Sequence, residues 1–324
     1  MIMEKSLLRE INKDLVKLYE IDICEIKKLT KKSFLVKDSD NTEYFIKKTN
    51  PFTSEKFKSL KEFGINNIIY PLNNKDNEFV SSFGSDNYYL TPYKKTNSLI
   101  SDMQVLNMYK ELKHVHGTTS IKRQLTQEKL RPKFEEITRQ LDYKFTLIEE
   151  FVRSVESKNL TIFSMPILSN YRYILDAKKE LVRLQKLLII QIKDKISVEY
   201  SIIHNNPKLD HLINTGGYRY LTSIDRSKLG LSSLDMAKLY IETEELNVDF
   251  KSYIVDYYYN YENTFYYDYF RFLILYIYIK RLKINNLDYV SAENFISTSS
   301  SIKKYFELFL DKQEQISNEE NTNN

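Results

Sequence analysis

The chain has 324 residues, and its 42% hydrophobic and 28% charged content is that of a soluble globular protein with one large core or two unequal ones. Its 48 basic and 44 acidic residues are interspersed and give a formal charge of +4, which argues against the field of one sign that a dedicated nucleic-acid binder carries. Because of this balanced charge we expect no nucleic-acid partner. A single cysteine, Cys24, excludes an internal disulfide framework and fits a reducing compartment, so we expect a cytoplasmic protein.

Segments that enter a membrane are not expected. Residues 1 to 14 carry charges throughout and lack the uninterrupted apolar core of a secretory signal. The most apolar stretch, FRFLILYIYIK at residues 270 to 280, is too short to cross a bilayer and contains Arg271. We therefore expect no membrane span, and we expect a buried helix at residues 270 to 280.

Residues 18 to 92 have the patterns of short β-strands. Five apolar or β-branched runs are separated by turn-forming residues, and they read YEIDICEIKKL, KSFLVKD, EYFIKKT, EFVSSFG and NYYLTPY. One helix interrupts them at residues 53 to 64, where a Thr or Ser cap precedes an apolar face of Phe57 and Leu60, and Gly64 ends the segment. Residues 1 to 93 are therefore predicted to form a small β-rich lobe with one helix.

From about residue 99 the pattern becomes helical. Two apolar stripes repeat at helical spacing and are expected to pack against neighbouring helices: Leu141, Phe145, Ile148, Val152 and Val155 in the first, and Leu181, Leu184, Leu188 and Ile192 in the second. Only residues 200 to 225 return to short strands. Residues 94 to 311 are therefore predicted to form a helical lobe that contains a hairpin at 200 to 226, and the polar residues 312 to 324 a disordered tail.

A small β-rich lobe, a hinge near residues 91 to 93 and a large helical lobe make the outline of an α+β, protein-kinase-like bilobal fold. Such an outline does not establish a function, because function depends on the residues of a site. The polar residues of the hairpin are the candidates for that site. They begin with His204, Asn205 and Asn206 after an apolar run, and they end with Asp225.

The hairpin residues carry a resemblance to a known family. Residues 204 to 213, HNNPKLDHLI, and residues 221 to 240, LTSIDRSKLGLSSLDMAKLY, resemble the catalytic loop of the aminoglycoside and choline phosphotransferase branch of the kinase-like superfamily, which reads HGDLxxxN before a hairpin ending in IDF or IDW, with a YDLA segment downstream. Residues 27 to 50, the run NYYLTPY and the helix MYKELKHVHGTTS are similar to the bacterial spore-coat kinase-like proteins of that branch, which pair a YYLT strand with an LHxxT helix end. The resemblance extends over about residues 18 to 310.

The resemblance implies which residues meet a nucleotide. Lys47 would be the phosphate-pairing lysine of the third strand, with Lys48 as the alternative one residue on. Its flexible ammonium would bond phosphate oxygens while a helix carboxylate holds it, and Glu55 is the first choice for that carboxylate and Glu62 the second. From the residues alone, two surface lysines at a strand end and a solvated acidic helix face explain the same pattern.

By the same resemblance His204 would brace the loop, and Asn206 would stand where the family has its catalytic aspartate. An amide has no useful basicity near neutral pH, so the general base that takes the proton of the substrate hydroxyl would be missing. Such assistance is worth roughly 10²- to 10⁴-fold in rate. Asp210, shortly after Asn206, is the alternative source of a carboxylate.

The metal-binding positions are altered as well. Asp225 keeps the place of the metal-binding aspartate, but His211 stands where the family has a magnesium-binding asparagine, and imidazole suits zinc or copper better than Mg²⁺. A partly buried loop histidine with no ligand is the alternative interpretation of His211. The turn over the phosphates reads LTKKS without glycine, so Lys31 and Lys32 would replace close backbone contacts by charge only in part. ATP and Mg²⁺ are therefore expected to bind weakly or not at all.

These features favour a degenerate kinase-like protein, a pseudokinase, that binds or scaffolds a protein partner. The alternative is an active, divergent ATP-dependent phosphotransferase acting on a small-molecule hydroxyl, with Asp225 on the metal, Lys47 on the phosphates and Asp210 as base. A third hypothesis, a structural component of a spore coat, rests on the resemblance to the spore-coat proteins and predicts self-association or a protein partner without nucleotide dependence.

Overall fold

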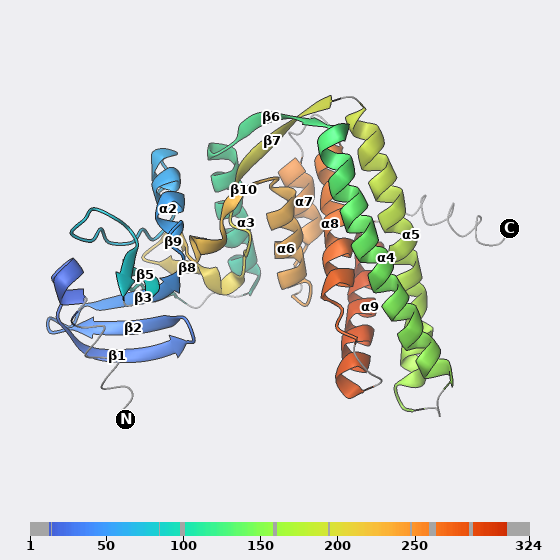
Figure 1. Ribbon diagram of the computed structural model, residues 1–324, viewed down its shortest axis with the longest axis horizontal. Helices are drawn as coiled ribbons and strands as arrows, with labels where there is room; N and C mark the ends of the chain where they lie inside the picture. Colours follow the sequence, from blue (N-terminus) through green and yellow to red (C-terminus); the bar gives the residue numbers. More distant parts are fainter. Residues whose placement is uncertain are drawn as a thin grey trace. The chain divides into compact units, whose positions relative to one another are not determined.

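The protein is described from a computed structural model (Figure 1), which describes residues 13, 15–83, 85–97, 101–157, 161–193, 195–246, 248–258, 264–284 and 288–309. The chain forms two compact units. The first comprises Met1–Ser120 and Tyr200–Asp235, and the second Ile121–Glu199 and Met236–Asn324. The first unit thus contains both the β-rich segment and the hairpin region. The lobe boundary predicted at residue 93 stays a prediction, and the tail predicted at 312 to 324 lies outside the described residues.

A five-stranded sheet in the order β1-β2-β3-β5-β4 belongs to the first unit (Figure 1). Its strands are β1 (Ile23–Thr30), β2 (Ser33–Asp38), β3 (Glu43–Thr49), β4 (Ser81–Phe83) and β5 (Asp86–Pro92). Every neighbouring pair in the sheet is antiparallel. The helix α2 (Thr53–Glu62) follows β3 and buries Phe57 and Leu60, as predicted, although it ends at Glu62 rather than at residue 64.

Strand alternation assigns the two faces of this sheet. One face carries the buried cluster of Phe34, Val36, Ile46 and Leu90, together with Leu15 and Ile23. Side chains alternate between faces along a strand, so Lys47 lies on the face opposite Ile46. Lys47 is in register with Ser33 of β2 and Tyr89 of β5, which share that opposite face. Lys47 therefore lies on the face that α2 contacts, where Phe57 packs edge-on against Tyr89.

The rest of the first unit is built around the hairpin region. Its elements are α3 (Ser101–Thr118), the end of β7 (Lys195–Ile203), the 3₁₀ turn η1 (Leu209–His211), β8 (Leu212–Thr215), β9 (Tyr218–Leu221), the 3₁₀ turn η2 (Ile224–Arg226), β10 (Lys228–Gly230) and the start of α6 (Ser233–Thr243). β8 and β9 form an antiparallel hairpin, and β10 pairs antiparallel with the end of β7. The return to short strands predicted for residues 200 to 225 is therefore present.

A polar face of α3 holds the hairpin region in place. Gln104 Nε2 donates to the carbonyl oxygens of Leu209 (2.9 Å) and Leu212 (3.1 Å), at the two ends of η1. Two helical turns further on, the buried Glu111 forms an ion pair with Nε of Arg219 in β9 at 2.5 Å. The loop that precedes β8 is thus fixed to a helix by side chains rather than left to its own turns.

The second unit is mostly helical. Besides β6 (Ile121–Thr126) and most of β7, it contains α4 (Gln127–Ser157), α5 (Ser164–Ile192), α7 (Phe250–Tyr258), α8 (Phe265–Arg281) and α9 (Tyr289–Phe309). α4, α5, α8 and α9 pack against one another (Figure 1), and every residue of the two predicted apolar stripes is buried. The predicted buried helix at 270 to 280 lies in α8, where the buried Arg271 pairs with Glu180 of α5 at 2.9 Å.

Two details of this unit depart from the sequence patterns. The pattern predicts helix from residue 99 and strands only after residue 200, yet β6 begins at Ile121 and β7 at Lys195. The two strands are neighbours in one sheet, so each gains its partner from a distant part of the chain, and local periodicity does not reveal such a pairing. None of the helices in the described part of the chain has the length and apolarity that crossing a membrane requires.

Candidate functional site

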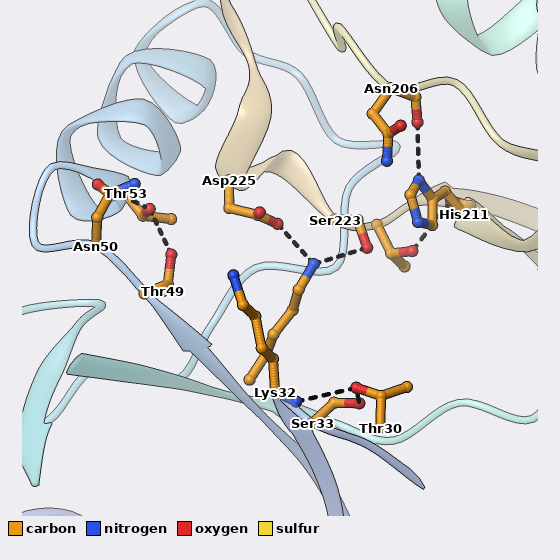
Figure 2. Close-up of polar contacts among 12 residues, drawn as sticks. Thr30, Lys32, Ser33, Thr49, Asn50, Thr53, Asn206, His211, Ser223 and Asp225 are labelled. Atoms are coloured by element: carbon orange, nitrogen blue, oxygen red, sulfur yellow. Dashed lines mark hydrogen bonds and ion pairs between the residues drawn. The ribbon is translucent and has the colours of Figure 1, made fainter. Parts of the chain in front are cut away.

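Lys47 of β3 reaches the far end of the hairpin region. Its Nζ donates to Oδ1 of Asp225 at 2.6 Å and to Oγ of Ser223 at 3.0 Å (Figure 2). The two charged side chains are 17% and 21% exposed, so this ion pair is only partly screened by water. Lys48 lies on the other face and pairs with Asp86 at 2.6 Å. Of the two lysines that the sequence offers, Lys47 is the one brought to Asp225.

The helix α2 presents a lysine to this site rather than a carboxylate. Glu55 is 72% exposed and lies 3.4 Å from Lys58, so the predicted pair of Lys47 with Glu55 is not formed. Glu62, the second choice, is exposed as well. Lys56 instead donates from Nζ to the backbone carbonyl of Asp225 at 2.6 Å. Burial lowers the pKa of the Lys56 ammonium, and the nearby Asp225 carboxylate partly opposes this. Sequence reasoning missed Lys56.

His204 braces its loop from the inside. The ring is buried, its Nε2 lies 2.7 Å from the carbonyl oxygen of Thr222, and its Nδ1 accepts from the backbone N–H of Asn206 at 3.3 Å. These partners place the ring proton on Nε2. Burial lowers the pKa of His204, which favours this neutral form, although the nearby Asp235 carboxylate acts in the opposite direction. A neutral histidine with both nitrogens engaged holds the loop in one conformation.

Asp235 is the second brace of this loop. Its side chain is fully buried and accepts from the backbone N–H groups of His204 (2.6 Å) and Asn205 (2.7 Å) and contacts Nε2 of His116 at 3.0 Å. Burial alone would raise the pKa of Asp235, but the hydrogen bond from His116 and the other donors lower it overall. Sequence reasoning assigned neither residue a role. The signals were Asp235 in the YDLA-like segment and His116 with Thr119 in the LHxxT-like helix end.

Asn205 has a left-handed backbone conformation at the tip of the loop. Its φ is 63°, in the left-handed region where the family pattern HGD supplies a glycine. Asparagine is among the residues that tolerate this region best, and its side-chain Nδ2 donates to the carbonyl oxygen of Arg226 at 3.1 Å. The loop therefore keeps a left-handed turn without the glycine. The hydrogen bonds that the backbone N–H and the side chain of Asn205 donate offset the strain.

Asn206 and His211 face each other across the loop. Nδ1 of His211 donates to the carbonyl oxygen of Asn206 at 2.8 Å (Figure 2), and burial lowers the pKa of His211, with His204 acting in the same direction. The side-chain amide of Asn206 makes no hydrogen bond within the described part of the chain. Asp210, the alternative carboxylate, is 77% exposed, with Oδ1 3.7 Å from Nε2 of His211. Asn206 and His211 thus place an amide and an imidazole at the two altered positions, and Asp210 adds one solvated carboxylate.

The turn between β1 and β2 is held without glycine. The hydroxyl groups of Thr30 and Ser33 lie 2.7 Å apart, and Thr30 Oγ1 accepts from the N–H of Lys32 at 3.2 Å. The carbonyl oxygen of Lys32 in turn accepts from the N–H of Lys48 at 2.7 Å. Figure 2 shows the side chain of Lys32 extending toward Asp225. The turn therefore offers a side-chain cation where a glycine-rich turn offers backbone amides.

A cavity of about 340 Å³ lies on the Lys47 face of the sheet. Its walls are mainly apolar and aromatic, and they include Leu29, Phe45, Ile69, Tyr89, Tyr93 and Ile213. Its polar lining includes Lys47, Asp210, His211, Thr222 and Ser223. A mainly apolar and aromatic cavity with a lysine in its lining suits a planar aromatic group joined to an anionic group. The residues therefore fit the base and phosphates of a nucleotide.

The same residues do not fit a magnesium ion. Mg²⁺ requires several oxygen ligands in near-octahedral geometry, usually one or two carboxylates with phosphates and water. Oδ1 of Asp225 is already bonded to Lys47, and His211 offers nitrogen. No group of three or more His, Cys, Asp or Glu side chains that could hold a metal ion occurs among the described residues. The donor set is therefore poorer in oxygen than a kinase metal site needs.

The buried His204 and the partly buried His211 make stability depend on pH. The folded-state pKa values of His204 and His211 lie below the ordinary value of 6.5, so the unfolded chain binds protons more readily as pH falls. The contribution of these histidines to the free energy of unfolding should be complete above about pH 6.5. It should decrease below that pH, by up to about 1.4 kcal/mol for each unit by which a histidine pKa is lower in the folded state. Urea titrations at about pH 7.5 and pH 5.5 measure this. His211→Gln should reduce the pH dependence, whereas the same change at the exposed His114 should not.

Comparisons with known proteins place this geometry in a fold. No protein-family model and no curated protein matches the sequence. Among solved structures, an aminoglycoside phosphotransferase from Alicyclobacillus acidocaldarius is similar with a TM-score of 0.62 and 13% identity, over 89% of this chain and 90% of that chain. A spectinomycin phosphotransferase has a TM-score of 0.53 and 16% identity, over 91% of this chain and 98% of that chain. An amicoumacin kinase has a TM-score of 0.52 and 12% identity, over 94% and 96%.

At these identities the likeness concerns the fold. It spans nearly the whole of each chain, and the similar structures are those of phosphotransferases and of a kinase. The sequence prediction of an α+β, protein-kinase-like bilobal fold is therefore confirmed. The chain has the fold of the aminoglycoside phosphotransferases and the kinases related to them.

Proposed function

We propose that the protein is a pseudokinase: a kinase-like protein whose cavity holds a nucleotide, or a ligand of similar shape and charge, without transferring a phosphoryl group. The observation that carries this proposal is Asn206. It follows the braced His204 and Asn205, in the place of a catalytic aspartate, and its side chain is an amide. An amide cannot take the proton of an attacking hydroxyl, and this assistance is worth roughly 10²- to 10⁴-fold.

The rest of the site supports binding more than chemistry. Phosphoryl transfer depends on positioning and on metal ions that bridge the phosphates and offset their charge. Here His211 offers nitrogen in place of an oxygen ligand, and Asp225 is engaged by Lys47. The cavity, in contrast, is suited to a nucleotide. Similar structures were determined with ADP in the spectinomycin phosphotransferase and with AMP-PNP and Ca²⁺ in the amicoumacin kinase.

Restoring the loop tests the proposal. ADP formation from ATP by the unchanged protein should stay at background, and Asn206→Asp with His211→Asn should raise it little, because α2 still lacks a carboxylate at the site. A coupled assay for ADP measures this with Mg²⁺ and with Mn²⁺. Turnover by the unchanged protein at about 1 s⁻¹ or more, the range of working kinases, contradicts the proposal.

A second candidate function is an active ATP-dependent phosphotransferase that acts on a small-molecule hydroxyl. The observation in its favour is that Asp210, a solvated carboxylate, lies on the cavity wall close to His211. In this reading Asp210 takes the place of the missing base, and Asp210→Ala and Lys47→Ala should each abolish turnover. Turnover that both variants retain excludes this function.

The proposed role is binding or scaffolding of a protein partner, in the cytoplasm. A relationship to the spore-coat kinase-like proteins, and a place in the coat, is the finer proposal, and the segments around NYYLTPY and the end of α3 support it. A coat component should associate with itself or a partner in the same way with and without ATP. Sedimentation velocity of the purified protein in both conditions measures the self-association.

A further inference from the structure

We propose that the cavity of the first unit binds the polyphosphate of a nucleoside di- or triphosphate through lysine side chains and without a divalent metal ion, with Lys56 of α2 supplying charge that a metal supplies in a kinase. This inference rests on the proposed function, because it concerns the same cavity. It adds how the anionic end of the ligand is held.

Lysines from two elements bond Asp225, and a third points in its direction. Lys47 of β3 donates to Oδ1 at 2.6 Å, Lys56 of α2 donates to the carbonyl oxygen at 2.6 Å, and Lys32 of the β1–β2 turn extends toward Asp225 (Figure 2). Asp225 is the one carboxylate that the described contacts give to these lysines. The two ammonium groups that bond Asp225 outnumber its one carboxylate and leave a local positive charge. Multiply charged phosphate is the ligand class that such a cluster attracts.

Lys56 is the less compensated of the two lysines that bond Asp225. It is half-buried, and its acceptor is a neutral backbone carbonyl rather than a carboxylate. The acidic residues of the same helix do not help, because Glu55 lies against Lys58 and Glu62 is exposed. A phosphate oxygen in place of the carbonyl would turn a hydrogen bond to a neutral acceptor into one between opposite charges, which is about twice as strong. The long, flexible lysine stem allows that change of acceptor.

A divalent cation is disfavoured at the place where the lysines favour a phosphate. Bound to the other oxygen of Asp225, it would lie beside the ammonium groups of Lys47 and Lys56, which carry charge of the same sign. Nδ1 of His211 donates to the carbonyl oxygen of Asn206, so His211 could offer only its Nε2, a nitrogen and not the oxygen that Mg²⁺ prefers. Mg²⁺ bound to ATP also removes negative charge from the phosphates. The lysine cluster therefore favours the metal-free nucleotide.

Isothermal titration calorimetry tests this inference on the full chain, with ATP and ADP as the probes, first in EDTA and then in excess Mg²⁺. Both nucleotides should bind in EDTA, and Mg²⁺ should weaken ATP binding by a factor of about 3 or more, because it lowers the charge that the lysines meet. ATP should also bind more tightly than ADP in EDTA, since it carries the greater charge.

Matched variants assign the effect to Lys56. Lys56→Gln should weaken ATP binding in EDTA by roughly tenfold, the value of one charge-assisted hydrogen bond. Lys61→Gln makes the same change of charge on an exposed position of the same helix and should leave the affinity unchanged. Lys56→Glu should abolish the binding in EDTA. If Lys56→Gln lowers the melting temperature of the free protein, Lys32→Gln, at an exposed turn, is the second variant and should weaken binding in the same direction.

The outcomes separate this inference from the proposed function. Binding that Mg²⁺ tightens by about tenfold or more overturns the inference, and so does the absence of binding in both buffers, while a protein without turnover would still be a pseudokinase. ADP formation in the coupled assay overturns the proposed function, whatever the calorimetry shows. Equal loss of affinity in Lys56→Gln and Lys61→Gln also overturns the inference, because the effect would then be one of net charge alone.

Discussion

Asp235→Ala should lower the free energy of unfolding by about 3 to 5 kcal/mol, the largest effect we expect from one substitution in the first unit. The change leaves the backbone N–H groups of His204 and Asn205 and the ring of His116 without their shared buried acceptor. Each unsatisfied buried donor costs about 1 to 3 kcal/mol. Urea titration followed by circular dichroism measures the loss.

Two further variants serve as a control and as an intermediate case for this substitution. Asp102→Ala removes an aspartate from the first turn of α3, where it is exposed, and should cost less than about 1 kcal/mol as a change in helix-dipole interaction. Asp235→Asn keeps the shape of the side chain but turns one acceptor into a donor, so its cost should lie between the two. A loss in Asp235→Ala no greater than in Asp102→Ala would mean that Asp235 does not hold the loop.

Lys47→Met should weaken nucleotide binding roughly 10- to 100-fold, because it removes the lysine that lines the polar end of the cavity. Methionine keeps the length and the apolar stem of the side chain, so the sheet should stay intact. The measurement is the shift of the melting temperature with ATP in EDTA, where saturating ligand at about 100 times its dissociation constant adds roughly 2.7 kcal/mol. At the same ATP concentration that stabilisation should fall to about 1.4 kcal/mol for a tenfold loss of affinity and to about 0.4 kcal/mol for a hundredfold loss.

Lys48→Met is the matched control for this change. Lys48 is the next residue of the same strand, but its side chain lies on the other face and pairs with Asp86. The variant should keep the ATP-dependent shift of the unchanged protein. An equal loss of the shift in both variants would mean that the cavity face of β3 is not where the nucleotide binds.

The fold was largely predictable because its signals are local. Short apolar or β-branched runs between turn-forming residues predicted the strands of the five-stranded sheet, and the helical stripes predicted α4 and α5, whose stripe residues are all buried. β6 was not predicted, since its strand character depends on β7, far along the chain. A pattern within one segment can show which face is apolar, but it cannot show a partner.

The site was predictable only in outline, because its details depend on how elements are turned. The choice between Lys47 and Lys48 required knowledge of which face of β3 is buried. Ile46 belongs to the buried cluster, so Lys47 lies on the other face of the sheet. In the phosphotransferase family that the sequence resembles, the helix in the place of α2 is expected to supply a carboxylate to the site. Glu55 and Glu62 are two turns apart, so they share one face of α2, and that face is exposed. Lys56 lies four residues before the buried Leu60, so it is turned inward with it.

The braces of the loop could not be found by periodicity at all. Asp235 meets His116 and the backbone of His204 and Asn205, and these contacts join three distant parts of the chain. The sequence resemblance marked the segments that contain Asp235 and His116, but a motif without coordinates does not say that one carboxylate serves three donors. The role of Asp235 follows only from the contacts.

The turn between β1 and β2 also determines how a ligand would arrive and leave. The hydrogen bond from the N–H of Lys48 to the carbonyl oxygen of Lys32 ties the turn to β3, and the paired hydroxyl groups of Thr30 and Ser33 close it. Binding there requires no ordering of a mobile flap, so the conformational entropy of association should be small. The association rate should then depend on diffusion and on the attraction of phosphates to the lysines, and it should fall as salt is added. A ligand of this cavity should therefore exchange rapidly, tracking its concentration in solution rather than remaining trapped.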